Sequence, residues 1–212
     1  MSTSYFVSAD WLIEHGDNPE VQIIDARMAP PGQEHRDLAA EYRAGHIPDA
    51  IRFDIEALSD HTSNLPHMLP RPEAFAVAMR ELGISHDKHL VVYDEGNLFS
   101  APRAWWMLRY FGAENVSILA GGLAGWQRDE LPLEQGDVTQ PESDFEVKTD
   151  PTTVKRLTDM LLVSHEGTAR SFTLVLRHAL RAKPTNRVRA LNAALFQVRV
   201  TCPGVNWWST VS

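Results

Sequence analysis

Short apolar runs alternate with amphipathic segments along the first 135 residues of the chain. Four of these runs have the length and composition of buried strands: VQIID at 21–25, AIRFD at 50–54, HLVVYD at 89–94 and VSILAG at 116–121. Runs of this kind are typical of strands that are covered on both faces. The pattern therefore predicts a sheet.

Amphipathic helices are predicted between and after the later runs. Phe75, Met79 and Leu82 recur at intervals of four and three, after a proline and before a glycine, as expected for one helix with its start and stop signals. The predicted helices are RPEAFAVAMRELG at 71–83, APRAWWMLRYFG at 101–112 and GGLAGWQRDELP at 121–132.

This alternation of strands and helices predicts an α/β fold. Its central sheet is expected to be largely parallel and flanked by helices on both faces. Ligands of such sheets bind beyond the carboxyl ends of the strands. The loop after HLVVYD is therefore the first place to look for a functional site.

The regular pattern stops after the first domain, which we place at residues 1–135. Residues 136–153 are acidic and rich in Pro, Gly, Ser and Thr, so they are predicted to be a linker. VKRLTDMLLVSHEG at 154–167 predicts an amphipathic helix, and residues 154–170 are interpreted as the start of a second domain. An incomplete or aberrant C-terminal segment is expected to follow.

Composition restricts the classes of partner. The chain has 212 residues, 43% of them hydrophobic, a single cysteine and a net charge of −8. One cysteine excludes an internal disulfide framework, and the acidic balance argues against nucleic acid or an anionic membrane as partner. Without a long apolar run or a signal-like N-terminus, the protein is expected in the cytoplasm. Small molecules or proteins remain as partners, and the chain is expected to be a monomer.

The charge is unevenly distributed along the chain. All 28 Asp and Glu residues lie before residue 171, whereas residues 171–212 contain basic residues and no carboxylate. Such a stretch is improbable for a globular segment of ordinary composition. The tail at 171–212 therefore differs in kind from the rest of the chain.

Four segments resemble the N-terminal domain of tandem-domain sulfurtransferases of the rhodanese family, most closely the bacterial 3-mercaptopyruvate type. They are IIDARM at 23–28, GHIPDAIRFDIEALSDHTSNLPHMLP at 45–70, HLVVYDEGNLFSAPRAWWMLRYFG at 89–112 and VSILAGGLAGWQ at 116–127. The resemblance implies two similar α/β domains with catalysis in the second. A cysteine of that second domain takes sulfur from 3-mercaptopyruvate or thiosulfate, holds it as a persulfide and passes it to a thiol or cyanide.

Asp94 stands where the second domain of the family would carry this cysteine. The first domain is thus expected to be the non-catalytic copy, with Asp94 bonding loop amides. The alternative is a phosphoryl-accepting aspartate, but such sites usually carry a second carboxylate two residues later, where this chain has Gly96. Arg103, Trp105 and Trp106 are interpreted as packing and helix-start residues rather than ligands.

Glu56 and His67 match the positions that, by the resemblance, form the first domain's part of a proton relay. They would reach toward a serine in the second domain's active loop, and a carboxylate that orients an imidazole suits proton transfer near neutral pH. The alternative is an exposed histidine and a surface glutamate. A metal site at His61 and His67 lacks further ligands, so neither a metal nor a cofactor is expected.

The tail shows no second copy of the DAR and HIPDA motifs. Back-translated and read one base earlier, LVLRHAL at 174–180 permits ARPAARF, and residues 195–207 permit a string beginning IPGA. We therefore hypothesise that a single-base insertion or deletion near codons 170–174 put the tail out of frame. Cys202 would then be an accident of the shifted frame rather than a nucleophile.

These expectations combine into one prediction and one alternative. The intact enzyme would be a sulfurtransferase with a small-molecule sulfur donor and a thiol acceptor, whereas this chain, which lacks the cysteine loop, is expected to have little or no activity. The alternative is a non-catalytic rhodanese-like binding module.

Overall fold

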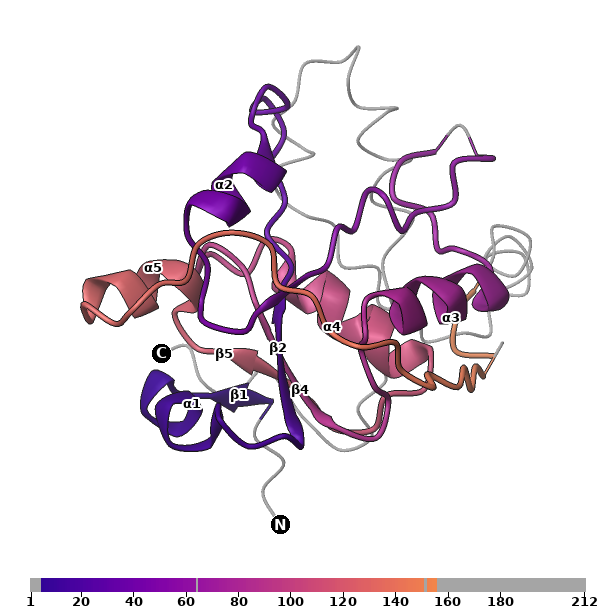
Figure 1. The fold of residues 1–212 in the computed structure, drawn as a ribbon. Coiled ribbons are helices and arrows are strands. Elements are labelled where there is room, and N and C mark those ends of the chain that lie inside the picture. The colour runs from indigo at the N-terminus through magenta and orange to yellow at the C-terminus, as the bar shows by residue number, and fades with distance from the viewer. Residues whose placement is uncertain (1–4, 64, 151, 156–212) are drawn as a thin grey trace, which may run out of the picture. The chain divides into compact units, whose positions relative to one another are not determined.

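The four predicted apolar runs contain four of the five strands of one parallel sheet. In the computed structural model, which describes residues 5–63, 65–150 and 152–155, five strands lie in the order β1-β5-β4-β2-β3, and every pairing is parallel. The strands are β1 (Phe6–Val7), β2 (Val21–Asp25), β3 (Ile51–Arg52), β4 (His89–Tyr93) and β5 (Val116–Leu119). Their carboxyl ends meet at one edge of the sheet, here called the carboxyl edge (Figure 1).

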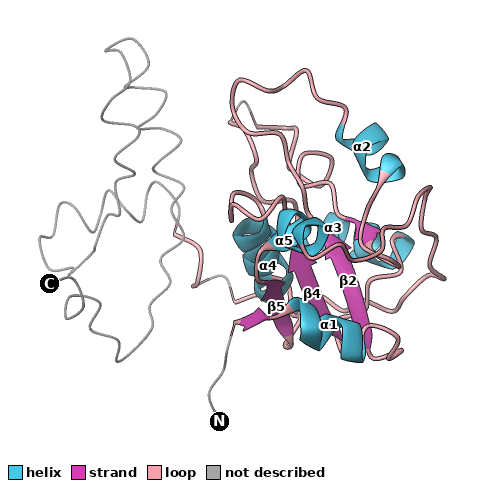
Figure 2. Cartoon of the chain, turned by 90° about the vertical axis from the view of Figure 1, so that its left-hand side faces the viewer, coloured by secondary structure: helices cyan, strands magenta, loops and turns pink. Residues whose placement is uncertain are grey.

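Helices cover both faces of this sheet (Figure 2). One face carries α3 and α4, and the other carries α1 and α5. The helices are α1 (Ala9–His15), α2 (Leu38–Ala44), α3 (Pro72–Glu81), α4 (Ala101–Tyr110) and α5 (Gly122–Arg128).

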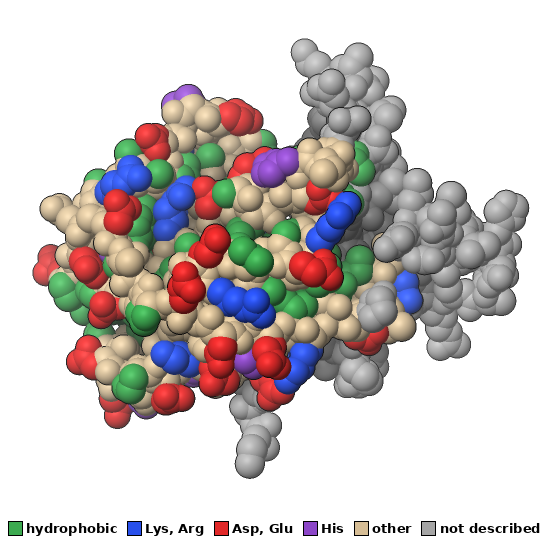
Figure 3. Space-filling view, turned by 45° about the vertical axis from the view of Figure 1, so that its right-hand side comes forward, with side chains coloured by type: hydrophobic (Ala, Val, Ile, Leu, Met, Phe, Trp, Pro, Cys, Tyr) green, Lys and Arg blue, Asp and Glu red, His purple; other side chains and the backbone are tan. Residues whose placement is uncertain are grey.

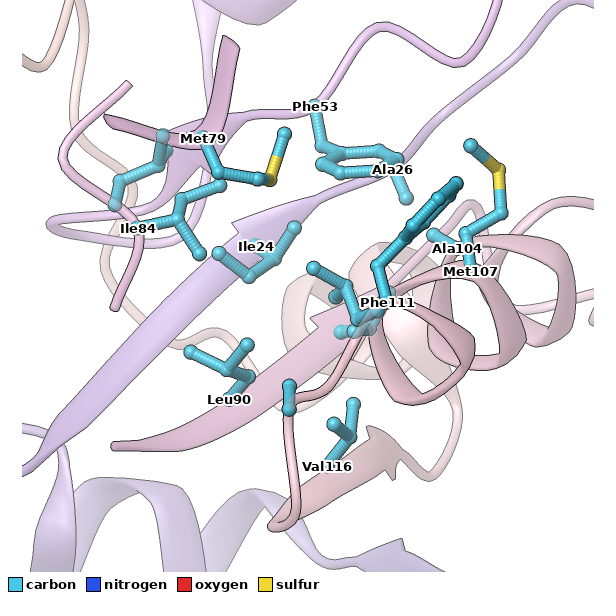
Figure 4. Close-up of a cluster of buried hydrophobic side chains, with 14 of the residues drawn as sticks. Ile24, Ala26, Phe53, Met79, Ile84, Leu90, Ala104, Met107, Phe111 and Val116 are labelled. Carbon is cyan, nitrogen blue, oxygen red and sulfur yellow. The ribbon is translucent and has the colours of Figure 1, made fainter. Parts of the chain in front are cut away.

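The alternation of side chains along the strands explains the two cores. On β2, Ile24 packs into the cluster under α3 and α4, while its neighbour Ile23 packs into the cluster under α1 and α5. The larger cluster centres on fully buried side chains such as Met79 and Phe111 (Figure 4). Successive side chains of a strand point to opposite faces, so a run that is apolar throughout is what a doubly covered sheet requires.

Three short elements were not predicted: β1, α1 and α2. Both helices begin at a capping side chain, because Ser8 accepts from the Trp11 amide and Asp37 accepts from the amides of Ala39 and Ala40. Each has only seven residues, too few to establish a helical period. The third predicted helix, expected to reach residue 132, ends at Arg128.

The compact unit extends to Thr149, beyond the boundary expected at residue 135. Phe145, in the segment predicted to be a linker, is fully buried, and its ring centroid lies 5.8 Å from that of Phe75. The Ser143 hydroxyl donates to the carbonyl of Ile84 at 2.6 Å. Residues 136–149, here called the strap, are polar in composition but contribute one buried aromatic side chain, Phe145, to the core.

Replacing Phe145 by leucine tests this packing. The variant loses the edge-to-face ring contact with Phe75, so we expect a loss of about 1 kcal/mol in the free energy of unfolding, measured with urea. Val138, on the same strap but only partly buried, serves as the control position when replaced by alanine. A true linker would show no difference between the two variants and the unmodified chain.

Of residues 150–212, the structure describes only residue 150 and residues 152–155. Apart from residues 154 and 155, the expected second-domain start at 154–170 therefore lies outside the described residues. So do the tail at 171–212 and Cys202.

The surface of the described part mixes charges of both signs. Acidic and basic side chains are interspersed over the face seen in Figure 3. Within the described ranges, no helix has the length and apolar character that crossing a bilayer demands.

Candidate functional site

A loop between β4 and α4, residues 94–100, lies at the carboxyl edge and is here called the cradle loop. The buried Asp94 carboxylate accepts three backbone hydrogen bonds, from Gly96 at 2.8 Å, Ser100 at 3.0 Å and Ala101 at 3.1 Å. The Ser100 side chain makes no capping bond, so Asp94 supplies the acceptor at the start of α4. Amides that converge at a helix start are a favourable environment for an anion, and here the carboxylate fills it.

Glycines let the cradle loop approach the start of α5 closely. A Cβ atom on Gly96 would lie 2.2 Å from the carbonyl oxygen of Gly121, and one on Gly122 would lie 2.5 Å from the carbonyl oxygen of Asp94. All three glycines have positive φ angles, which side-chain-bearing residues rarely adopt. The start of α5 therefore packs directly against the backbone of the cradle loop and restrains its conformation.

A buried ion pair supports the same edge one strand away. Asp25, at the end of β2, receives hydrogen bonds from Arg27 Nε at 2.9 Å and from the Tyr93 hydroxyl at 2.8 Å. Burial is the largest single influence on the pKa of Arg27 and lowers it, but the hydrogen bond to Asp25 and the nearby anionic groups together outweigh burial, so the pKa is raised. Burial and the nearby Asp25 carboxylate raise the pKa of the Tyr93 phenol well above its ordinary value.

Arg27 also connects this pair to the segment before β3, because its Nη2 donates to the carbonyl of Gly45 at 3.1 Å. The Tyr93 hydroxyl accepts from the amide of Ile47 at 3.2 Å. The pair thus fixes the HIPDA segment against β2 and β4.

Glu56 and His67 lie in contact on the loop that follows β3. The distance from His67 Nδ1 to Glu56 Oε2 is 2.7 Å, and the side chains are 44% and 58% exposed. An exposed pair of this kind contributes little to stability. Nδ1 is the ring nitrogen of His67 that lies next to the carboxylate.

Asp54 fixes the backbone at Glu56. Its carboxylate accepts from the amides of Glu56 and Ala57, both at 3.1 Å, and pairs with Arg52 Nη2 at 2.6 Å. The Glu56 side chain therefore starts from a turn that is tied to the end of β3.

A scan of protein families matches residues 8–129 to the family described as "Rhodanese-like domain". The chain belongs to the rhodanese-like family. The matched range contains every strand of the sheet except β1, together with the cradle loop and the Glu56–His67 pair.

Relatives of this rhodanese-like chain include the 3-mercaptopyruvate sulfurtransferase of Escherichia coli K12. The two are 72% identical over 169 residues, which is 80% of this chain and 60% of the relative. The human 3-mercaptopyruvate sulfurtransferase is 41% identical over 160 residues, 73% of this chain and 54% of the relative. The chain thus spans little more than half the length of these curated relatives.

Solved structures give the same picture of the rhodanese-like fold. The crystal structure of SseA from Escherichia coli matches with a TM-score of 0.76 and 71% identity, covering 79% of this chain and 64% of that one. The Tum1 protein of Saccharomyces cerevisiae matches with a TM-score of 0.67 and 27% identity, covering 77% of this chain and 57% of that one. The predicted fold class is confirmed.

The structure places the predicted site residues of the rhodanese-like domain as follows. Glu56 and His67 are brought together, and Asp94 lies in the cradle loop with loop amides as its partners. No cluster of three or more His, Cys, Asp or Glu side chains suited to a metal ion occurs within the described ranges.

Sequence reasoning missed two features of this site. Asp25 and Arg27 were read only as part of the DAR motif, and their buried pairing with Tyr93 depends on neighbouring strands. Arg103, expected to be a packing and helix-start residue, lies in the first turn of α4, and its guanidinium also donates to the carbonyl of His67 at 2.8 Å. The only signal in the sequence for this contact is the position of Arg103, a charged residue in the first turn of the helix that follows the cradle loop.

Proposed function

We propose that this domain is the supporting half of a 3-mercaptopyruvate-type sulfurtransferase that uses a small-molecule donor and a thiol acceptor. The observation that carries the proposal is the 2.7 Å contact between His67 Nδ1 and Glu56 Oε2 beside the carboxyl edge. Relatives that share 72% and 41% of their aligned residues are named as enzymes of this activity. The sulfur-carrying cysteine would come from a second domain, because Asp94 occupies the equivalent position here.

The proposed reaction explains why a proton relay is needed. A cysteine thiolate attacks the sulfur of 3-mercaptopyruvate, the carbon–sulfur bond breaks, and its electron pair leaves on the carbon as the enolate of pyruvate. The donor's thiol proton must move to that carbon for the products to be a persulfide anion and pyruvate. An imidazole can accept this thiol proton and release it to the carbon near neutral pH.

His67 is suited to this transfer because Glu56 directs its Nδ1. A carboxylate that accepts from Nδ1–H leaves the lone pair on Nε2 and stabilises the imidazolium that forms when Nε2 takes the proton. The half-exposed setting of both side chains keeps them accessible to a substrate at this edge. Glu56 and His67 are therefore the residues we assign to proton transfer.

The chain alone and a hybrid enzyme together test the proposal. In the hybrid enzyme, residues 5–149 of this chain replace the matching segment of the E. coli relative, which supplies the remaining domain. We expect the chain alone to release no pyruvate from 3-mercaptopyruvate and to form no persulfide at Cys202, as measured by mass spectrometry, whereas the hybrid turns over. A persulfide on Cys202, or a folded but inactive hybrid, would contradict the proposal.

A non-catalytic binding module is the second candidate. Leu98 and Phe99, on the cradle loop, are 47% and 39% exposed, so two adjacent apolar side chains of this loop lie at the surface. A stable complex between the unmodified chain and a thiol-carrying protein, lost when both residues are replaced by serine, would favour this function over the catalytic one.

A further inference from the structure

Arg103 lies in the first turn of α4 and reaches across to the Glu56–His67 loop. Its Nη2 donates to the main-chain carbonyl of His67 at 2.8 Å, and its guanidinium carbon lies 5.3 Å from the centre of the Trp106 ring. This contact joins residues 36 positions apart in the chain. The carbonyl that it holds belongs to the same residue whose imidazole meets Glu56.

The guanidinium is kept in this position at a cost. Its Nε is buried without a hydrogen-bond partner, and no ion pair to Arg103 occurs among the residues that the structure describes. Burial lowers the pKa of Arg103. A buried donor left unpaired costs about 1 to 3 kcal/mol. An arginine that carries this cost calls for a function that offsets it.

The backbone of His67 needs an external restraint. Its φ angle is +54°, in the left-handed region that a residue with a side chain seldom adopts. A hydrogen bond to the carbonyl of that same residue limits rotation of the peptide group that follows. The direction of the imidazole toward Glu56 depends on this backbone conformation.

Resting on the proposed function, we infer that Arg103 is the positioning residue for His67. It holds the His67 backbone in the left-handed conformation so that Nδ1 faces Glu56 and Nε2 stays open for a proton. Arg103 does not touch the reacting atoms in this account. Its effect passes through the carbonyl of His67 alone.

Arg109 offers a matched control on the same helix. Its guanidinium carbon lies 5.2 Å from the centre of the Trp105 ring, and its Nη1 donates to the carbonyl of Glu114 at 3.1 Å. It therefore repeats the cation–ring and carbonyl contacts of Arg103 at the other end of α4. Replacing it disturbs the helix in the same way without reaching the Glu56–His67 loop.

The experiment measures which nitrogen of neutral His67 carries the proton, from the imidazole ¹⁵N chemical shifts of the full chain. We expect the Nδ1–H form to predominate in the unmodified chain and in Arg109→Met. In Arg103→Met the Nε2–H form should become the major one, and Arg103→Lys, which keeps a donor, should restore the Nδ1–H form. Arg103→Gln, too short to reach the carbonyl, repeats the test with a polar head if the methionine variant does not fold.

An unchanged His67 tautomer in folded Arg103→Met or Arg103→Gln would overturn the inference. The inference would also be overturned if Arg109→Met shifted the tautomer of His67 as strongly as Arg103→Met does. These spectra do not depend on turnover, so the positioning role of Arg103 can stand even if the hybrid enzyme is inactive. Conversely, if the hybrid is active but the tautomer of His67 does not depend on Arg103, the proposed function still stands and only the positioning role of Arg103 fails.

Discussion

Replacing Asp25 by alanine is expected to destabilise the domain by about 3 to 5 kcal/mol, because it leaves a buried guanidinium without its counterion. Arg27 and Asp25 side chains are only 6% and 3% exposed, and their closest atoms lie 2.7 Å apart. The Tyr93 hydroxyl loses its acceptor in the same variant. Urea unfolding followed by tryptophan fluorescence measures the change.

The ion pair between Arg43 and Asp137 is the control for this prediction. Its side chains are 54% and 65% exposed, so Asp137→Ala should cost less than about 1 kcal/mol. Both substitutions remove one carboxylate and lower the net negative charge equally. Equal losses in the two variants would show that burial of the Asp25 pair contributes nothing special to stability.

Replacing His67 by alanine is expected to lower kcat of the hybrid enzyme by about 100-fold or more, the typical contribution of general acid–base catalysis. The substitution removes the group assigned to proton transfer but no buried contact, since the side chain is 44% exposed. The effect should therefore fall on kcat, with the melting temperature unchanged. Steady-state release of pyruvate from 3-mercaptopyruvate measures it.

His61 provides the matched control on the same loop. It is exposed, six residues before His67, and has no contact with Glu56 among the described hydrogen bonds and ion pairs. His61→Ala should leave kcat within a factor of about two of the unmodified hybrid, since exposed residues away from a site have small effects. Equal losses at His61 and His67 would point to the loop as a whole rather than to one imidazole.

The long, regular elements of the fold could be predicted from the sequence because their apolar residues repeat over several turns or fill a whole strand. Strands β2, β4 and β5 and helices α3 and α4 belong to this class. β1 has two residues and α2 seven, and elements this short depend on their neighbours for stability. The strap around Phe145 could not be predicted, because a single buried aromatic residue does not produce a repeating pattern of apolar positions.

The candidate site was predictable where a motif placed chemistry on one loop. Asp94 follows its strand directly, and its carboxylate reaches the amides next to it in the chain. The contact of Arg103 with His67 could not be predicted, because it needs α4 and the loop after β3 to lie side by side. Long-range polar contacts of this kind leave no local pattern in a sequence.

A double-mutant cycle at Glu56 and His67 in the hybrid enzyme tests the central claim most directly. If the carboxylate acts only by orienting the imidazole, Glu56→Ala lowers kcat when His67 is present and has no further effect in the His67→Ala background. The combined variant should then match His67→Ala alone. Multiplicative losses, with Glu56→Ala equally harmful in both backgrounds, would contradict the account, because the two residues would then act independently.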